Sequence, residues 1–301
     1  MFLTEEQAKN KDLICYLLKQ IITAPIEKIK PLRTGKTSHT YEVNNDLIVK
    51  FPSYKTILSD WQMQSENALV LQRMLSFQIP QVNLKQVFLN STSKQSLTVL
   101  SYPKIQGHIV PREDFVNKPA QFKQRFFEQL SDATMQIHDV LPNSLPVPPL
   151  TTEELARRMF PVRPDNSVFN KIFRSMLYMP VVGFKEVSKR ILCHSDLHSN
   201  NICLDEKDNL VGILDFDSLN QGDYFCEFRP ALYKSEADNE QFKQTYEKMS
   251  GRTISNKDIQ RMAIVYNLMR NAFYTSARIK KIVGIKPKML PLPYTTTHDF
   301  S

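Results

Sequence analysis

Residues 193–218 read CHSDLHSNNICLDEKDNLVGILDFDS, and this stretch decides what fold and function the chain can have. It brings together polar side chains that can ionise or bind a metal, and six of them lie beside short apolar runs at either end of the charged turn DEKDN. These six are His194, Asp196, His198, Asn201, Asp215 and Asp217. Burying polar groups at this density costs free energy unless they bind something. The stretch therefore predicts a binding or catalytic site.

Length and composition limit what such a site can serve. The chain has 301 residues, of which 42% are hydrophobic and 23% charged, as is typical of a globular protein. Its four cysteines form no CxxC pair and no zinc-ligand spacing, which indicates reduced thiols. The N-terminus is charged almost at once, and no apolar run approaches the roughly 18 residues of a membrane helix. We expect a cytoplasmic protein.

Charge is unevenly distributed along the chain. The formal net charge is +8, yet residues 205–240 carry ten acidic and three basic side chains. The acidic residues of 236–240 begin a predicted helix, where they suit the helix dipole. Asp217, Asp223 and Glu227 are left as candidates for a pocket that attracts a cationic molecule.

The spacing of apolar residues predicts an α+β chain. Short strand-like runs occur at 26–52 and again before residue 102, and a helix is predicted over 59–76, between the third and fourth strands. After residue 102 the pattern is mainly helical, beginning with a long amphipathic helix at 119–140. We expect a small sheet in the first third of the chain and helices in the rest.

The polar cluster fits the chemistry of phosphoryl transfer. His194, Asp196 and Asn201 follow the spacing H-x-D-x-x-x-x-N, in which a loop can aim the carboxylate at a hydroxyl group while the amide oxygen binds a metal. Asp215 ends an apolar strand and could bind the same ion. Mg²⁺ prefers oxygen ligands and is often shared with phosphates. A base, a metal amide and a metal carboxylate are the minimal parts for this reaction.

A lysine in the predicted sheet is the remaining candidate residue for phosphoryl transfer. Lys50 lies in LIVKFP, on the third predicted strand, where a buried ammonium is costly unless an anion meets it. Glu66 on the following helix is its natural partner. A solvent-facing lysine on an edge strand is the alternative, and the metal motif downstream favours the functional interpretation.

The chain resembles the protein-kinase-like fold, and within it the aminoglycoside phosphotransferase family. HSDLHSNN at 194–201 is similar to the catalytic loop of that family, and ILDFD at 213–217 to its metal-binding segment. Gly222-Asp223 and the histidine of LSDATMQIHDV, His138, also match. The resemblance implies two lobes. Residues 1–102 would form an N-lobe with a small antiparallel sheet and one helix, and residues 103–301 a mainly helical C-lobe.

The resemblance also implies roles for single residues. Asp196 would be the catalytic base, Asn201 and Asp215 the Mg²⁺ ligands, and His194 a structural residue of the loop. Lys50, paired with Glu66, would contact the α- and β-phosphates of ATP or GTP.

Further residues would hold the nucleotide. The hinge segment 100–103, with Ser101 and Tyr102, would bind the purine through its backbone, and Thr37 and Ser38 would cover the phosphates. This phosphate loop has a single glycine, Gly35, and Asp217 stands where protein kinases have the glycine of D-F-G. Both departures argue against a protein kinase more than against catalysis.

Two rival interpretations use the same residues. His194, Asp196 and His198 alternate along the chain and could form a zinc triad of a hydrolase. That interpretation leaves Asn201 and Asp215 unexplained, and catalytic zinc needs an open site. A non-catalytic nucleotide-binding pseudokinase would lack the base or the lysine, and here both are present.

We therefore expect a monomeric, Mg²⁺-dependent phosphotransferase that moves the γ-phosphate of ATP or GTP to a hydroxyl group of a cationic small molecule. An aminoglycoside or related amino-sugar is the favoured acceptor, and choline, homoserine or a sugar-like alcohol is the alternative. Neither a nucleic acid nor a membrane is an expected partner.

Overall fold

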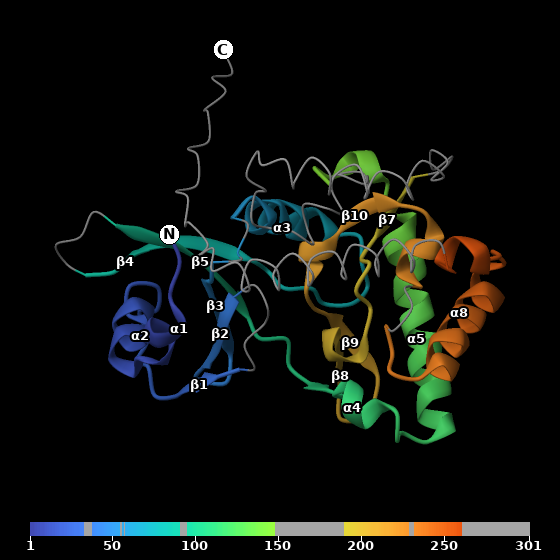
Figure 1. The fold of residues 1–301 in the computed structure, drawn as a ribbon, viewed down its shortest axis with the longest axis horizontal. Helices are drawn as coiled ribbons and strands as arrows, with labels where there is room; N and C mark the ends of the chain where they lie inside the picture. Colours follow the sequence, from blue (N-terminus) through green and yellow to red (C-terminus); the bar gives the residue numbers. More distant parts are fainter. Residues whose placement is uncertain are drawn as a thin grey trace, which may run out of the picture.

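The computed structural model describes residues 1–32, 38–54, 56, 58–90, 95–147, 190–228 and 232–260 (Figure 1). In this part of the chain the N-terminal third forms a five-stranded antiparallel sheet with the strand order β1-β2-β3-β5-β4. The strands are β1 (Ile29–Pro31), β2 (Ser38–Val43), β3 (Leu47–Pro52), β4 (Asn83–Phe88) and β5 (Ser96–Pro103). The mixed α+β composition and the antiparallel sheet agree with the prediction.

The turn between β2 and β3 fixes the register of the lysine-bearing strand. Asn44 and Asn45 have positive φ angles of 53° and 64°, which asparagine tolerates better than most residues. The side chain of Asn44 also donates to the carbonyl of Pro25 at 2.8 Å and accepts from the amide of Glu27 at 2.9 Å. These hydrogen bonds stabilise the turn. In the resulting strand register, Lys50 pairs with Thr40 of β2 and with Leu100 of β5.

The two faces of this sheet are covered by different helices. Two short N-terminal helices, α1 (Glu5–Lys9) and α2 (Lys11–Leu18), pack on the face that carries Val49 and Phe51. Ile48 alternates to the other face, where it clusters with Trp61 of α3 (Leu58–Leu71). Lys50 lies two positions after Ile48 and so belongs to this second face.

The remaining described elements are mainly helices and short strands. They are β6 (His108–Ile109), α4 (Arg112–Phe115), α5 (Ala120–Asp139), η1 (Pro142–Ser144), β7 (Ile191–Cys193), η2 (Ser199–Asn201), β8 (Ile202–Leu204), β9 (Leu210–Ile213), η3 (Phe216–Ser218), β10 (Asn220–Gly222), η4 (Tyr224–Glu227) and α8 (Glu236–Ser250), where η marks a 3-10 turn. Residues 148–189 and 261–301 of the predicted helical part lie outside the described residues.

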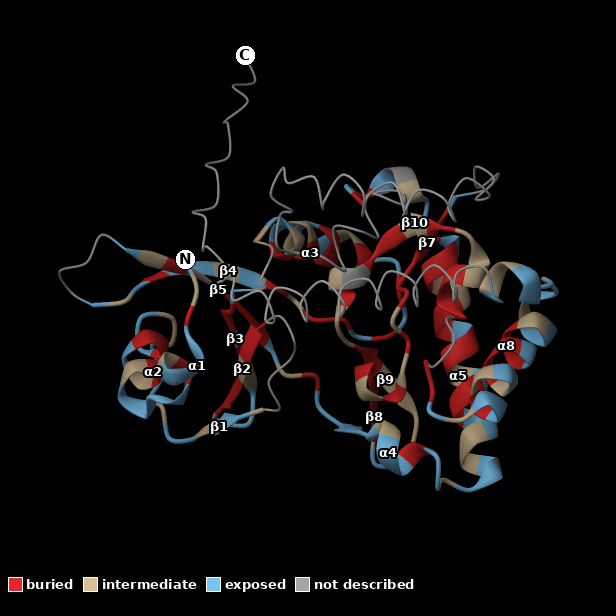
Figure 2. Ribbon diagram, viewed as in Figure 1, coloured by how far each residue is buried: buried red, intermediate tan, exposed pale blue. Residues whose placement is uncertain are grey.

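A single apolar cluster joins these helices to the short strands. Helices α5 and α8 lie side by side, and their facing sides are buried (Figure 2). Phe127 of α5 stacks on Phe242 of α8 with ring centroids 5.8 Å apart. Leu197 and Phe216, which flank the polar motif, belong to the same cluster. The packed helices therefore provide the rigid base on which the candidate site is held. Among the described residues, no helix is both long and apolar enough to cross a lipid bilayer.

Candidate active site

The loop between β7 and β8 carries the first half of the motif and is held in an uncommon conformation. Ser195 has a φ of 63°, a value that a residue with a side chain rarely adopts. The backbone amides of His194 and Ser195 both donate to the carboxylate of Glu227, the second at 2.8 Å. These two charge-assisted bonds compensate for the local strain and fix the direction of the loop.

Glu227 is therefore not a pocket residue. It is 0% exposed, and besides the two loop amides its carboxylate lies 3.6 Å from Nε2 of His138 on α5. Burial raises the pKa of this carboxyl group, but His138, His194 and the amide of Ser195 outweigh it and leave the pKa below its ordinary value. The prediction that Glu227 binds a cationic acceptor is wrong, because an interior carboxylate that holds the loop cannot meet a ligand.

His138 continues the same interior network. Its Nδ1 lies 2.7 Å from the hydroxyl of Tyr246 on α8, which accepts a bond from Arg252 at 3.1 Å. Nε2 faces the carboxylate of Glu227, and Nδ1 shares a hydrogen bond with the Tyr246 hydroxyl. The network ties the loop to α5 and α8, and sequence reasoning identified His138 without finding this role.

His194 braces the loop from the opposite side. It is fully buried, its Nε2 lies 2.9 Å from the carbonyl of Leu214, and its Nδ1 accepts from the amide of Asp196 at 3.2 Å. Both ring nitrogens are thus used within the protein. The zinc triad considered above finds no support, because a zinc ligand needs a free ring nitrogen.

Asp196 and Asn201 lie together at the end of this loop. The amide nitrogen of Asn201 donates to the backbone carbonyl of Asp196 at 2.9 Å and approaches its carboxylate at 3.4 Å. Because the nitrogen faces Asp196, the amide oxygen of Asn201 is the atom left to bind a cation. His198 Nε2 also lies 3.5 Å from the Asp196 carboxylate. Two neighbours therefore restrict the rotation of this carboxylate.

Residues 213–217, which are predicted to bind a metal and are called the metal segment below, lie directly against the loop. The amide of Leu214 donates to the carbonyl of Asn201 at 2.8 Å, so Asp215 follows immediately beside Asn201. Asp215 itself has a positive φ of 67° at the start of η3. One carboxylate and one amide oxygen side by side suit a hard cation such as Mg²⁺, which retains open positions for phosphate oxygens.

Lys50 connects the sheet to this segment. Its ammonium nitrogen lies 3.4 Å from Oδ1 of Asp215 and 5.9 Å from the ring centroid of Tyr102. Burial alone would lower the pKa of Lys50, but Asp215, Tyr102 and Asp217 outweigh it and leave the pKa raised. Burial likewise raises the pKa of Asp215, yet Lys50 and His194 leave it below its ordinary value. The pair is therefore ionised.

The predicted partner of Lys50 lies elsewhere. Glu66 is on the exposed side of α3, and the ion pair that the structure gives Lys50 is with Asp215. The buried side of α3 carries Trp61, Gln64 and Asn67 instead. The predicted Lys50–Glu66 pair is wrong because the phase of the helix turns Glu66 toward solvent.

Other predicted nucleotide residues have mixed placements. Ser101 lies inside β5 opposite both Val49 of β3 and Asn83 of β4. Its backbone is enclosed by two strands, so the prediction that it binds a purine through its backbone is wrong. Tyr102 lies at the end of β5 on the Lys50 face, and Ser38 is buried at the start of β2. Thr37 lies outside the described residues.

The two remaining acidic candidates occupy different surroundings. Asp217 is close to Asp215, Lys50 and Asp196, on the side where Lys50 meets the metal segment. Burial, followed by the charge of Asp215, raises the pKa of Asp217 to about 8. Asp223 is half-buried nearer to Asp258 and His138, and burial raises its pKa. The structure thus places Asp217 near Lys50 and Asp215, and Asp223 at a separate position.

The raised pKa of Asp217 predicts an unusual pH dependence of stability. The folded protein holds this proton up to about pH 8, whereas the unfolded chain releases it near pH 4. Stability of the metal-free protein should therefore fall as the pH rises through this window. Asp217→Asn should remove that dependence and stabilise the protein at pH 8.5, on the order of 1–3 kcal/mol.

Urea unfolding in EDTA at pH 5, 7 and 8.5 measures the effect. The control is Asp132→Asn, an exposed carboxylate on α5, which should leave the pH dependence of the wild type unchanged. If the free energy of unfolding of the wild type and of Asp217→Asn changes with pH in the same way, a group other than Asp217 is responsible for the pH dependence.

A second group of metal-binding residue types lies in the interior. Ligand atoms of His138, Cys193 and Glu227 fall within 4.8 Å of one another. However, Glu227 already accepts two backbone amides, and the Cys193 thiol donates to the carbonyl of Asp223 at 3.4 Å. The donors are used by the hydrogen-bond network, so we assign this cluster to structure.

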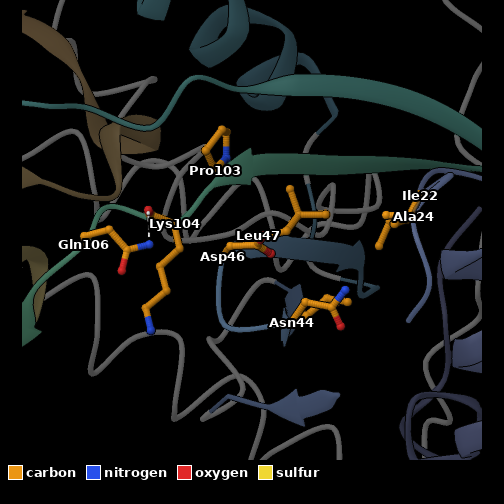
Figure 3. A pocket seen from close by; sticks show the side chains of 9 residues that line it. Ile22, Ala24, Asn44, Asp46, Leu47, Pro103, Lys104 and Gln106 are labelled. Carbon is orange, nitrogen blue, oxygen red and sulfur yellow. Dashed lines mark hydrogen bonds between the residues drawn. The ribbon is translucent and has the colours of Figure 1, made fainter. Parts of the chain in front are cut away.

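A cavity of about 440 Å³ lies apart from these residues (Figure 3). It is bounded by the β2–β3 turn, by the chain that follows β5 and by the segment after α2. Its lining comprises Ile22, Ala24, Val43, Asn44, Asp46, Leu47, Pro103, Lys104 and Gln106. Val43 and Leu47 pack with the cluster on the α2 face of the sheet, opposite to Lys50. This cavity is therefore not the candidate active site.

A sheet lysine that contacts an aspartate, beside a loop with an Asp–Asn pair, is the arrangement expected of kinase-like phosphotransferases. The chain belongs to the phosphotransferase enzyme family, whose sequence model matches residues 28–264. The family resemblance inferred from the motif is confirmed.

Solved structures share the fold over nearly the whole chain. The GDP complex of aminoglycoside 2'-phosphotransferase-IIIa is 17% identical with a TM-score of 0.67, covering 92% of this chain and 95% of that one. The ADP and streptomycin complex of APH(3'')-Id from Streptomyces rimosus is 16% identical, with a TM-score of 0.60 and coverages of 86% and 98%. Macrolide 2'-phosphotransferase MphH from Brachybacterium faecium is 12% identical, with a TM-score of 0.59 and coverages of 91% and 95%.

Proposed function

We propose that this protein transfers the γ-phosphate of a nucleoside triphosphate to a hydroxyl group of an aminoglycoside or related amino-sugar, with Mg²⁺. The observation that carries the proposal is the 3.4 Å contact between Lys50 and Asp215, because it brings a sheet lysine to a metal segment that itself adjoins Asn201. Donor, metal and base residues thereby converge on one region.

Each residue then has a defined task. Asp196 orients the acceptor hydroxyl and accepts its proton, and its contacts with Asn201 and His198 fix its direction. The amide oxygen of Asn201 and the carboxylate of Asp215 would hold Mg²⁺, which neutralises phosphate charge when bound. Lys50 binds the donor phosphates. We assign residues 1–102 and 103–301 to two lobes that enclose the donor.

The acceptor class rests on relatives and on chemistry. Proteins of this fold have been solved with kanamycin, gentamicin and streptomycin, all of them aminoglycosides. With Glu227 assigned to the interior, Asp223 is the acidic candidate outside the cation-binding region. A macrolide is the second candidate, since a macrolide phosphotransferase has the same fold at comparable similarity. Fold alone does not determine the substrate.

A turnover panel tests the proposal. Purified protein with Mg²⁺ is incubated with ATP or GTP and, in separate reactions, with kanamycin, gentamicin, streptomycin, a macrolide, choline and homoserine. Mass spectrometry should find one added phosphoryl group on at least one aminoglycoside, dependent on Mg²⁺. Phosphorylation of the macrolide or of choline alone would reject the aminoglycoside assignment, and no transfer to any alcohol would reject the kinase assignment.

A further inference from the structure

The buried face of α3 carries two amide side chains with polar atoms that lack hydrogen-bond partners. Gln64 is 3% exposed and Asn67 is 1% exposed. Within the described part of the chain, Oε1 of Gln64 and both polar atoms of Asn67 have no partner. Buried polar groups are nearly always satisfied, so three unsatisfied atoms on one helix face need an explanation. A ligand that binds beside the helix would supply the partners.

The position of these amides identifies the region they face. Trp61, one turn before Gln64, clusters with Ile48 and Tyr102 on the Lys50 face of the sheet. Ala68 and Leu71, one turn later, cluster with Phe216 of the metal segment. Helix α3 also packs directly against η3. Gln64 and Asn67 therefore lie on the stretch of α3 between the lysine strand and the segment that begins at Asp215.

The charges of this region explain why amides suit it. Lys50 faces Asp215, and Asp60 adds further negative charge nearby, while the charge of Asp215 already contributes to raising the pKa of Asp217 to about 8. A carboxylate on the buried face of α3 would increase the repulsion among these groups. An amide can accept a hydrogen bond from an ammonium group and donate one to a phosphate without adding charge.

We propose that Gln64 and Asn67 are positioning residues that hold Lys50 and the phosphates of a bound nucleotide. The proposal rests on the phosphotransferase function argued above. An ammonium group has three N–H donors, and Asp215 accepts one of them in this structure. The Lys50 ammonium does not reach the amide oxygens of Gln64 and Asn67 in this structure; in the nucleotide-bound protein these oxygens accept from Lys50, and the amide nitrogen of Asn67 donates to a phosphate oxygen. The two amides take the place that Glu66 was predicted to fill.

Variants that keep shape and remove polarity test the proposal. Gln64→Met and Asn67→Leu are compared with the control Glu66→Gln, which changes the exposed side of the same helix. The dissociation constants of ADP and GDP are measured by calorimetry, with Mg²⁺ and again in EDTA. We expect each apolar variant to have a dissociation constant about 10-fold higher than that of the wild type, for whichever of the two nucleotides the wild type binds. The control should not change it.

Thermal melting of the nucleotide-free protein separates this role from a merely structural one. Replacing an unsatisfied buried amide by an apolar group of the same size should leave the melting temperature equal or higher. Unchanged nucleotide affinity in both folded variants would overturn the proposal and leave the proposed function standing. Failure of the wild type to bind either nucleotide would overturn both. Where leucine is not accommodated at position 67, Asn67→Ala takes its place.

A double-mutant cycle with Lys50→Met adds a second requirement. If the amides act through Lys50, their effect on nucleotide affinity should shrink when the lysine is absent. Fully additive effects of Lys50→Met and Asn67→Leu would contradict the assigned contact.

Discussion

Replacing Asp196 by asparagine is expected to lower turnover by about 10²–10⁴-fold, because the amide cannot accept the proton of the acceptor hydroxyl. Binding of ADP or GDP should be retained, since Lys50 and Asp215 are untouched. Steady-state rates with the acceptor found by the turnover panel give the first quantity, and calorimetry gives the second.

The matched control for this variant is Asp208→Asn. Asp208 is a partly exposed carboxylate in the β8–β9 turn with a φ of 60°, a conformation that asparagine also adopts readily. It should retain the turnover of the wild type. Near-normal turnover of Asp196→Asn with every phosphorylated acceptor would mean that another group serves as the base.

Replacing Glu227 by glutamine is expected to reduce the free energy of unfolding by about 3 kcal/mol at pH 7. Glutamine offers one acceptor oxygen where two backbone amides and His138 require a carboxylate. The pKa of Glu227 lies below its ordinary value in the folded protein. Its contribution is therefore complete above about pH 4.5 and is lost as the pH falls through the lower folded pKa.

Urea unfolding at pH 7 and at pH 3 checks both parts of this prediction, and the difference between the wild type and Glu227→Gln should shrink at the lower pH. Glu236→Gln, an exposed position at the start of α8, should change stability by no more than about 0.5 kcal/mol. Equal stability of Glu227→Gln and the wild type at pH 7 would contradict the anchoring role.

The local sequence was enough to predict the parts of the site that are held in place by residues close to them in the chain. The hairpin of β8 and β9 is short, so Asn201 and Asp215 had to meet once both strands were recognised. The run LIVKFP, apolar except for Lys50, predicted a core strand that carries the lysine, and both neighbours of Lys50 are buried. These inferences needed the pattern of a strand and the length of a turn.

The wrong predictions concern side chains whose burial depends on elements far away in the sequence or on the rotation of a helix. The acidity of residues 205–240 gave no sign that α5 and α8 would enclose Glu227, because the partner histidine lies 89 positions earlier. The error at Glu66 has a different cause. Charge favoured Glu66 as the lysine partner, but the buried stripe of α3, with Trp61 and Leu71, sets the rotation of the helix. Apolar packing outweighs a single ion pair in that choice.

The contact between Lys50 and Asp215 has a consequence for folding. The two residues are 165 positions apart, and Glu227, which anchors the loop, follows later still. Closing so long a loop is entropically unfavourable until the intervening helices pack. During synthesis, at about 5–20 residues per second, the sheet can form well before its catalytic partners leave the ribosome. Catalytic competence is therefore acquired late, when the sheet docks onto the completed loop and metal segment.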